Sequence, residues 1–121
     1  MKDTAEYEAD LYRESLLSIY SHTGTHMDAP MHLLENAPGI LQIPLSRCFA
    51  PGVLLDVRGQ RDIQPPDLPP GALSHKAVLL LTGMEACYGT DAYYRDHPSV
   101  SLALARHLVQ EGIAFLGMDM P

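Results

Sequence analysis

The sequence has few cysteines, few basic residues and no long apolar run, and each shortage excludes a class of protein. Its two cysteines, Cys48 and Cys87, are too few for a disulfide-stapled secreted domain. Eight basic residues against fifteen acidic ones give a net charge of −7, which argues against nucleic acid or an anionic membrane as a partner. The longest wholly apolar run, residues 77–81, is far too short to cross a bilayer.

Length and hydrophobic content predict one folded domain over residues 1–121. The chain is 46% hydrophobic, which argues against disorder. A chain of this length buries about two-thirds of its unfolded surface when it folds. The acidic start of the chain has neither the basic nor the apolar region of a signal peptide, so we expect a cytoplasmic protein.

Apolar stretches at three places predict buried strands. They occupy residues 53–57, 77–82 and 113–118, each bounded by glycine, proline or polar residues. A shorter, half-apolar stretch at 15–20 predicts a strand that ends near Tyr20. Residues 58–74 are rich in proline and are expected to form a loop.

One helix is predicted from Ser99 to Glu111. Ser99 or Ser101 can cap its start, and Gly112 can end it. The predicted apolar face of this helix consists of Leu102, Leu104, Ala105, Leu108 and Val109. A helix set between predicted strands, with a short glycine turn, indicates an α/β architecture.

The stretch with the strongest chemical signal is residues 22–32. It holds three of the six histidines and one aspartate, at positions 22, 26, 28 and 32, and no Lys, Arg or Glu. Imidazole nitrogen and carboxylate oxygen are ligands of zinc and similar divalent metals. Solvated or structural histidines are the alternative, but this density on one short segment favours a metal site.

Local residue types predict the shape of this stretch. Gly24 and Pro30 argue against a helix, so we expect an ordered loop. Residues two apart in an extended segment point the same way, which places His26 and Asp28 on one side. A reversal at Gly24 would bring His22 to them. His32 lies beyond the proline and is either a fourth ligand or a free base beside the metal.

The same stretch resembles a known family. It matches every fixed position of the signature His-x-Gly-Thr-His-x-Asp-x-Pro-x-His of the cyclase-like metal hydrolases, which include bacterial kynurenine formamidase and isatin hydrolase. Residues 53–57, 81–83 and 117–121 also look like the family and follow in the family's order. The resemblance covers the chain from about residue 16 to its end.

This resemblance implies a function and a set of roles. His22, His26 and Asp28 would be ligands of zinc or manganese, and His32 would be the catalytic acid/base. Family members hydrolyse amide-type C–N bonds of small molecules, such as aryl-formamides or cyclic amides, through metal-activated water. They have a swivelling β/α fold and assemble as dimers or tetramers, so a homo-oligomer is expected.

The sequence also departs from the family. Members are considerably longer, and the downstream His and Glu that complete their two-metal site cannot be mapped onto this chain. We therefore expect an incomplete version of the fold, through truncation, splitting or degeneration. The resemblance leaves two functions open: a hydrolase, active if intact or completed by a partner, and a non-catalytic metal-binding or oligomerising domain.

The remaining histidines and both cysteines are predicted to have no catalytic role. His107 falls on the polar side of the predicted helix and should be solvated. His97 precedes a proline in a turn, and His75 follows the proline-rich loop and should be exposed. Cys48 and Cys87 have no histidine at a suggestive spacing and are taken as small neutral thiols.

Two strand ends are weaker candidates. Thr82 and Gly83 end a predicted strand, where backbone amides either face a substrate or form a simple turn. Asp119 ends the last predicted strand, and strand ends in α/β folds often face a site. A solvent-facing carboxylate is an equally good prediction for Asp119.

Overall fold

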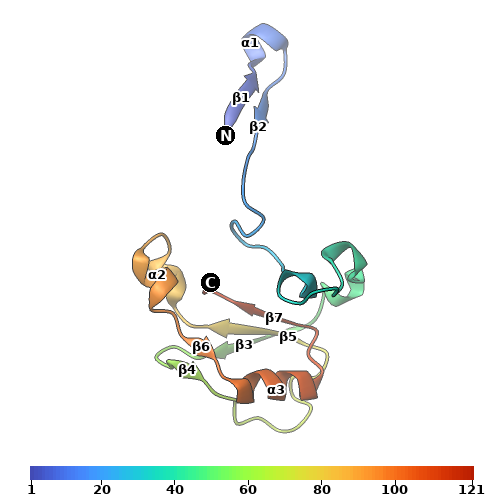
Figure 1. Cartoon of the computed structure of the whole chain (residues 1–121), viewed down its shortest axis with the longest axis vertical. Coiled ribbons are helices and arrows are strands. Elements are labelled where there is room, and N and C mark those ends of the chain that lie inside the picture. The colour runs from blue at the N-terminus through green and yellow to red at the C-terminus, as the bar shows by residue number, and fades with distance from the viewer. The chain divides into compact units, whose positions relative to one another are not determined.

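Two stretches of the chain form separate units in the computed structural model, which describes residues 1–121. The first unit is Met1–Gln42 and the second is Ile43–Pro121. Figure 1 shows the first unit in blue to teal and the second in green to red. Helix and strand together give the mixed α/β composition that the sequence predicts.

The first unit begins with a small antiparallel hairpin. Strands β1 (Lys2–Ala5) and β2 (Glu14–Leu16) pair across helix α1 (Tyr7–Asp10). The predicted strand over 15–20 is wrong at its end, because β2 stops at Leu16. Leu16 pairs with Lys2, the first residue of β1, so the residues after it have no strand to pair with.

No large apolar side chain of the first unit is buried. Ala5 is its one buried residue, with 7% of its surface exposed. Beyond the hairpin, the chain makes 3₁₀ turns at Pro30–His32 and Ile40–Gln42. A two-stranded hairpin without a hydrophobic face against a core is only marginally stable, so this unit draws little stability from its own packing.

The second unit is built on a parallel sheet. Strands β3 (Gly52–Asp56), β5 (Ala77–Leu81) and β7 (Phe115–Met118) lie in the order β3-β5-β7. The three strands predicted from the sequence are confirmed, each within two residues of its expected ends. Their predicted burial holds only for most of β5, because β3 and β7 contain no buried residue. Their carboxyl ends share one edge of the sheet, because all three strands run in the same direction.

Helix α3 (Leu102–Glu111) is shorter than predicted. Ser101 caps it, since its Oγ accepts the amide of Leu104 at 3.0 Å, and Gly112 ends it at φ 67°. The predicted start at Ser99 is wrong, because residues 99–100 form β6 (Ser99–Val100), which pairs with β4 (Asp62–Ile63). Pairing with a distant strand therefore outweighs the local helix preference there.

The core of the second unit lies between the sheet and α3. From the helix, only Leu104 and Leu108 are fully buried, which makes the buried stripe narrower than the predicted face. Leu102 and Val109 of that face are 66% and 79% exposed, and Ala105 is exposed too. The other buried members of this core are Val57, Ile63, Leu73, Val78, Leu80 and Met120.

Short helices complete the second unit. A 3₁₀ turn at Met84–Cys87 and helix α2 (Asp91–Arg95) follow β5, and a further 3₁₀ turn lies at Leu45–Arg47. Figure 1 shows α2 beyond the arrowhead of β5, at the carboxyl end of the sheet. None of the helices has the length and apolar character needed to cross a membrane.

Candidate functional site

The histidine loop of the first unit is shaped by two local features. Gly24 has φ +70°, a left-handed conformation that glycine adopts without steric cost, and it reverses the chain after His22. Ala29 is extended, as expected before a proline, and Pro30 then starts the 3₁₀ turn that contains His32. The amide of His32 donates to the carbonyl of Ala29 at 2.9 Å and closes this turn.

Three of the predicted ligand side chains converge on one point. His22 Nδ1 lies 2.9 Å from Asp28 Oδ1 and 3.1 Å from His26 Nε2. The third separation, from His26 Nε2 to Asp28 Oδ1, is 3.6 Å. Ligand bonds of 2.0–2.1 Å in a tetrahedral zinc site place neighbouring donors about 3.3 Å apart. The spacing of these three atoms therefore fits one divalent ion.

His32 joins the same cluster through ring contact. Its ring centroid lies 4.1 Å from that of His22. His22, Asp28 and His32 each offer one ligand atom, and these atoms all lie within 4.8 Å of one another. The loop thus gathers all four predicted site residues, and the arrangement accommodates His32 either as a ligand or as a neighbouring base.

A backbone hydrogen bond orients His26 within this cluster. Its Nδ1 lies 2.7 Å from the carbonyl of Gly24, which favours a proton on Nδ1 and leaves the Nε2 lone pair facing the other ligands. His22, His26 and Asp28 thus bring two imidazole nitrogens and one carboxylate oxygen to one point, where a shared proton or a cation can join them. Their side chains are 42%, 33% and 47% exposed, so an ion there would remain open to solvent and small molecules.

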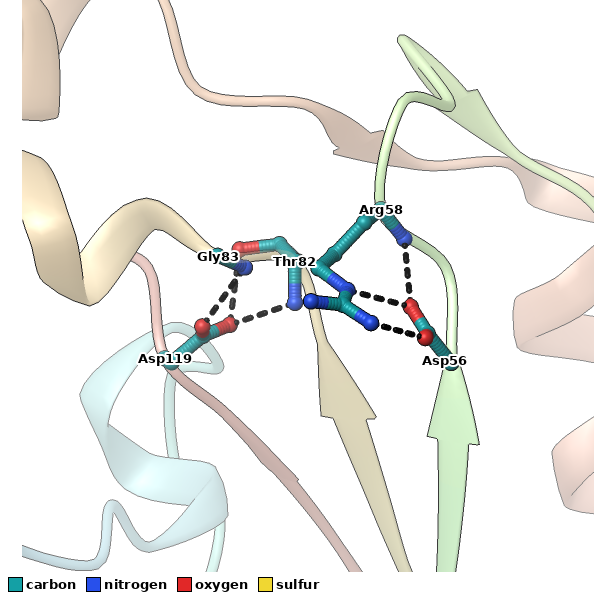
Figure 2. Close-up of polar contacts among 5 residues, drawn as sticks. All are labelled: Asp56, Arg58, Thr82, Gly83 and Asp119. Atoms are coloured by element: carbon teal, nitrogen blue, oxygen red, sulfur yellow. Dashed lines mark hydrogen bonds and ion pairs between the residues drawn. The ribbon is translucent and has the colours of Figure 1, made fainter.

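A second polar cluster lies at the carboxyl edge of the parallel sheet, in the second unit. The Asp119 carboxylate accepts hydrogen bonds from the amide of Thr82 at 2.8 Å, from its hydroxyl at 2.7 Å, and from the amide of Gly83 at 2.8 Å (Figure 2). Asp119 is half-buried, so of the two alternatives for this residue the solvent-facing carboxylate is wrong. The two amides are used inside the fold and do not face a substrate.

Protonation of Asp119 is coupled to that of Glu85. Partial burial raises the pKa of Asp119, but hydrogen bonds from Glu85, Thr82 and Gly83 outweigh it and hold that pKa well below its usual range. The pKa of Glu85 is raised in turn, because its protonated carboxyl donates to Asp119. Asp119 therefore loses its proton at a lower pH than Glu85 does.

An ion pair that the sequence reasoning missed lies beside this cluster. Arg58 donates to Asp56 from Nε at 2.9 Å and from Nη2 at 2.6 Å, and these bonds lower the pKa of Asp56 to about 2. Figure 2 shows the Arg58 side chain beside the Thr82–Gly83 turn. A Cβ added at Gly83 would lie 3.5 Å from the Arg58 stem. One sign of this ion pair was present in the sequence, because Asp56 is a charged residue near the end of a predicted strand.

The other three histidines belong to the second unit. His75 is exposed, as predicted, and has a left-handed φ of 56°. His97 Nδ1 lies 2.9 Å from the carbonyl of Pro98, which agrees with a turn role. The prediction for His107 is wrong, because it is half-buried and its Nε2 is shielded from solvent without a partner. Cys48 and Cys87 are both half-buried.

Comparisons with known proteins point to one family. The model of the family described as "Putative cyclase" matches residues 2–121. A kynurenine formamidase of Bacillus thuringiensis subsp. konkukian is 29% identical over 106 residues, which cover 87% of this chain and 50% of the relative. Enzymes of the same name from Bacillus mycoides and Geobacillus thermodenitrificans are 28% and 25% identical, with the same coverage. The chain thus spans about half the length of these relatives. No solved structure matches it.

Proposed function

This chain belongs to the cyclase family, and we propose that it is a metal-dependent hydrolase of an amide-type C–N bond. The observation that carries the proposal is the convergence of His22, His26, Asp28 and His32 within one loop. The relatives named kynurenine formamidase favour a formyl group on an aryl amine as the bond cleaved. A cyclic amide is the second substrate class that the family resemblance suggests.

Each of the four residues of the histidine cluster has a proposed role. His22, His26 and Asp28 would hold zinc or manganese, which when bound would polarise the amide carbonyl and activate a water molecule. His32, beside this set, would donate a proton to the nitrogen that leaves, because imidazole exchanges protons near neutral pH. The hydrogen bond between His26 and Gly24 would keep the ligand nitrogen of His26 aimed at the ion.

The proposal extends to the fold and the assembly. We propose a cytoplasmic homo-oligomer, a dimer or tetramer, with the swivelling β/α fold of the family. The first unit exposes many large apolar side chains to water. Exposed apolar surface of this kind is typical of an interaction site and supports association. Because the chain spans about half of its relatives, a non-catalytic metal-binding or oligomerising domain is the alternative function.

Metal binding is the first test. We expect the purified chain to bind zinc or manganese near one ion per chain, measured by elemental analysis after dialysis. Asp28→Asn should weaken binding at least about ten-fold, because it removes the one anionic ligand of the set. Glu35→Gln is the matched control, since it removes a nearby exposed carboxylate outside the cluster. Unchanged affinity in Asp28→Asn would reject Asp28 as a ligand.

A second variant separates the metal from the chemistry. His32→Ala should keep the ion but lose most hydrolysis of an aryl-formamide, with kcat reduced by about 10² to 10⁴ if His32 is the proton donor. Loss of the ion in His32→Ala would make His32 a ligand instead. A chain that binds metal but hydrolyses neither aryl-formamides nor cyclic amides would favour the non-catalytic alternative.

A further inference from the structure

Three tyrosines gather on the short segment that follows β5. Tyr88 comes directly after the 3₁₀ turn Met84–Cys87, and Tyr93 and Tyr94 belong to α2. The rings of Tyr88 and Tyr93 are 5.3 Å apart at 82°, and those of Tyr93 and Tyr94 are 5.1 Å apart at 85°. Edge-to-face contacts of this kind hold the three rings in fixed orientations.

Packing of the rings against one another buries only one of them. Tyr93 is half-buried at the centre of the group, and its position follows from local packing. Tyr88 and Tyr94 flank it and remain 65% and 59% exposed. Two large aromatic rings thus stand on either side of a third, with most of their surface in water, and they form an exposed aromatic contact surface.

The charges around these rings favour one sign of ligand. Residues 84–96 hold three acidic residues, Glu85, Asp91 and Asp96, and one basic residue, Arg95, so their net charge is −2. The Asp119 charge also reaches the cluster: burial, the neighbouring tyrosines and Asp119 together raise the pKa of Tyr93. The face of an aromatic ring is itself electronegative, so both rings and carboxylates attract a cation.

We propose that Tyr88, Tyr93 and Tyr94 form a binding surface for an organic ammonium ion, meaning a primary or methylated amine group of a small molecule. The exposed rings supply the contact, and the excess of acidic residues in the segment 84–96 supplies the charge complementarity. A neutral group of the same shape gains the apolar contact alone. This surface lies wholly in the second unit and does not depend on the proposed hydrolase activity.

A titration of the full-length chain tests the proposal. The probe is tetramethylammonium, compared with neutral tert-butanol, which has a similar shape, at constant ionic strength. The readouts are the tyrosine ring resonances in NMR and tyrosine fluorescence, which is unobscured because the chain has no tryptophan. We expect saturable changes with tetramethylammonium and clearly smaller changes with tert-butanol over the same range.

Single variants locate the binding surface. Tyr88→Leu and Tyr94→Leu should each weaken tetramethylammonium binding by about three-fold, since they remove a ring face but keep an apolar side chain. Tyr88→Phe keeps the ring and should bind as the parent does. Tyr12→Leu, an equally exposed tyrosine in the first unit, should also leave binding unchanged.

The outcomes that overturn the proposal are equally definite. Equal shifts with tert-butanol would mean an apolar surface without preference for a cation. Unchanged binding in both Tyr88→Leu and Tyr94→Leu would place the ammonium elsewhere on this acidic chain. Circular dichroism of each variant confirms that α2 and the sheet remain folded, so that a loss of binding can be attributed to the missing ring.

Discussion

The two units of this chain differ in how their residues are held in place. In the first, the four residues of the histidine cluster come from one short loop, and Ala5 is the one buried residue. In the second, a core between sheet and helix fixes the strand ends, where Asp119 meets residues 36 and 37 positions earlier. A set of candidate ligands can thus be gathered locally without a core, whereas the polar network at the sheet edge exists only after the second unit has folded.

The largest expected effect is the loss of stability on truncating a buried leucine of the second unit, compared with an exposed leucine of the first. Leu104→Ala should destabilise the chain by about 2–5 kcal/mol, because Leu104 is fully buried and its truncation leaves a cavity. Leu41→Ala, at a position that is 99% exposed, should change stability by no more than about 0.5 kcal/mol. Urea unfolding followed by circular dichroism measures both. A comparable cost in Leu41→Ala would show that the first unit is packed in solution.

A smaller effect probes the strand-end network. Asp119→Asn should destabilise the second unit by about 2 kcal/mol, because an amide group cannot accept all three hydrogen bonds from Thr82 and Gly83. Asp67→Asn is the matched control, an exposed carboxylate on the proline-rich loop. Equal urea midpoints for Asp119→Asn and the parent would contradict a stabilising role for this carboxylate.

The same network predicts a pH dependence. The pKa of Asp119 is lower in the folded chain than in the unfolded one, so its contribution is fully present above the unfolded value, near pH 4. The contribution is lost as the pH falls from there towards the folded pKa. Asp119→Asn should therefore show a weaker loss of stability between pH 5 and pH 3 than the parent, measured by urea midpoints at each pH.

The smallest expected effect tests the start of α3. Ser101→Ala should cost about 1 kcal/mol, because the Leu104 amide loses its capping partner inside the core. Ser99→Ala should cost less, since Ser99 is exposed and belongs to β6 rather than to the cap. Thermal unfolding of the two variants compares them directly. A larger cost at Ser99 would restore the longer helix that the sequence alone suggests.

The histidine loop could be predicted from sequence because everything that shapes it is local. Gly24 and Pro30 set the turns, and the ligand candidates lie within the same eleven residues. The strands of the second unit could also be predicted, since a short continuous apolar run is typical of a strand in a parallel sheet. Their burial on both faces could not, because Leu54 is 63% exposed and Leu79 is 40% exposed. For these parts, neighbouring residues carry the whole signal.

The rest of the structure depends on distant contacts. Nothing near Ser99 indicates that it pairs with Asp62, and that pairing shortens α3. The shielded side of His107 also depends on what the helix packs against, which periodicity does not reveal. Asp119 and Thr82 were both noted as strand ends, but only the register of β5 and β7 makes one the acceptor of the other.

The order of strands in the parallel sheet has a consequence for how the sheet can assemble. Strands β3, β5 and β7 are neighbours in space in the same order in which they occur in the chain. The β3–β5 pair can therefore form before β7 joins it, and β7 then adds to an edge that already exists. A chain cut after residue 81 would leave β5 as an open edge, available to a competing strand from another molecule.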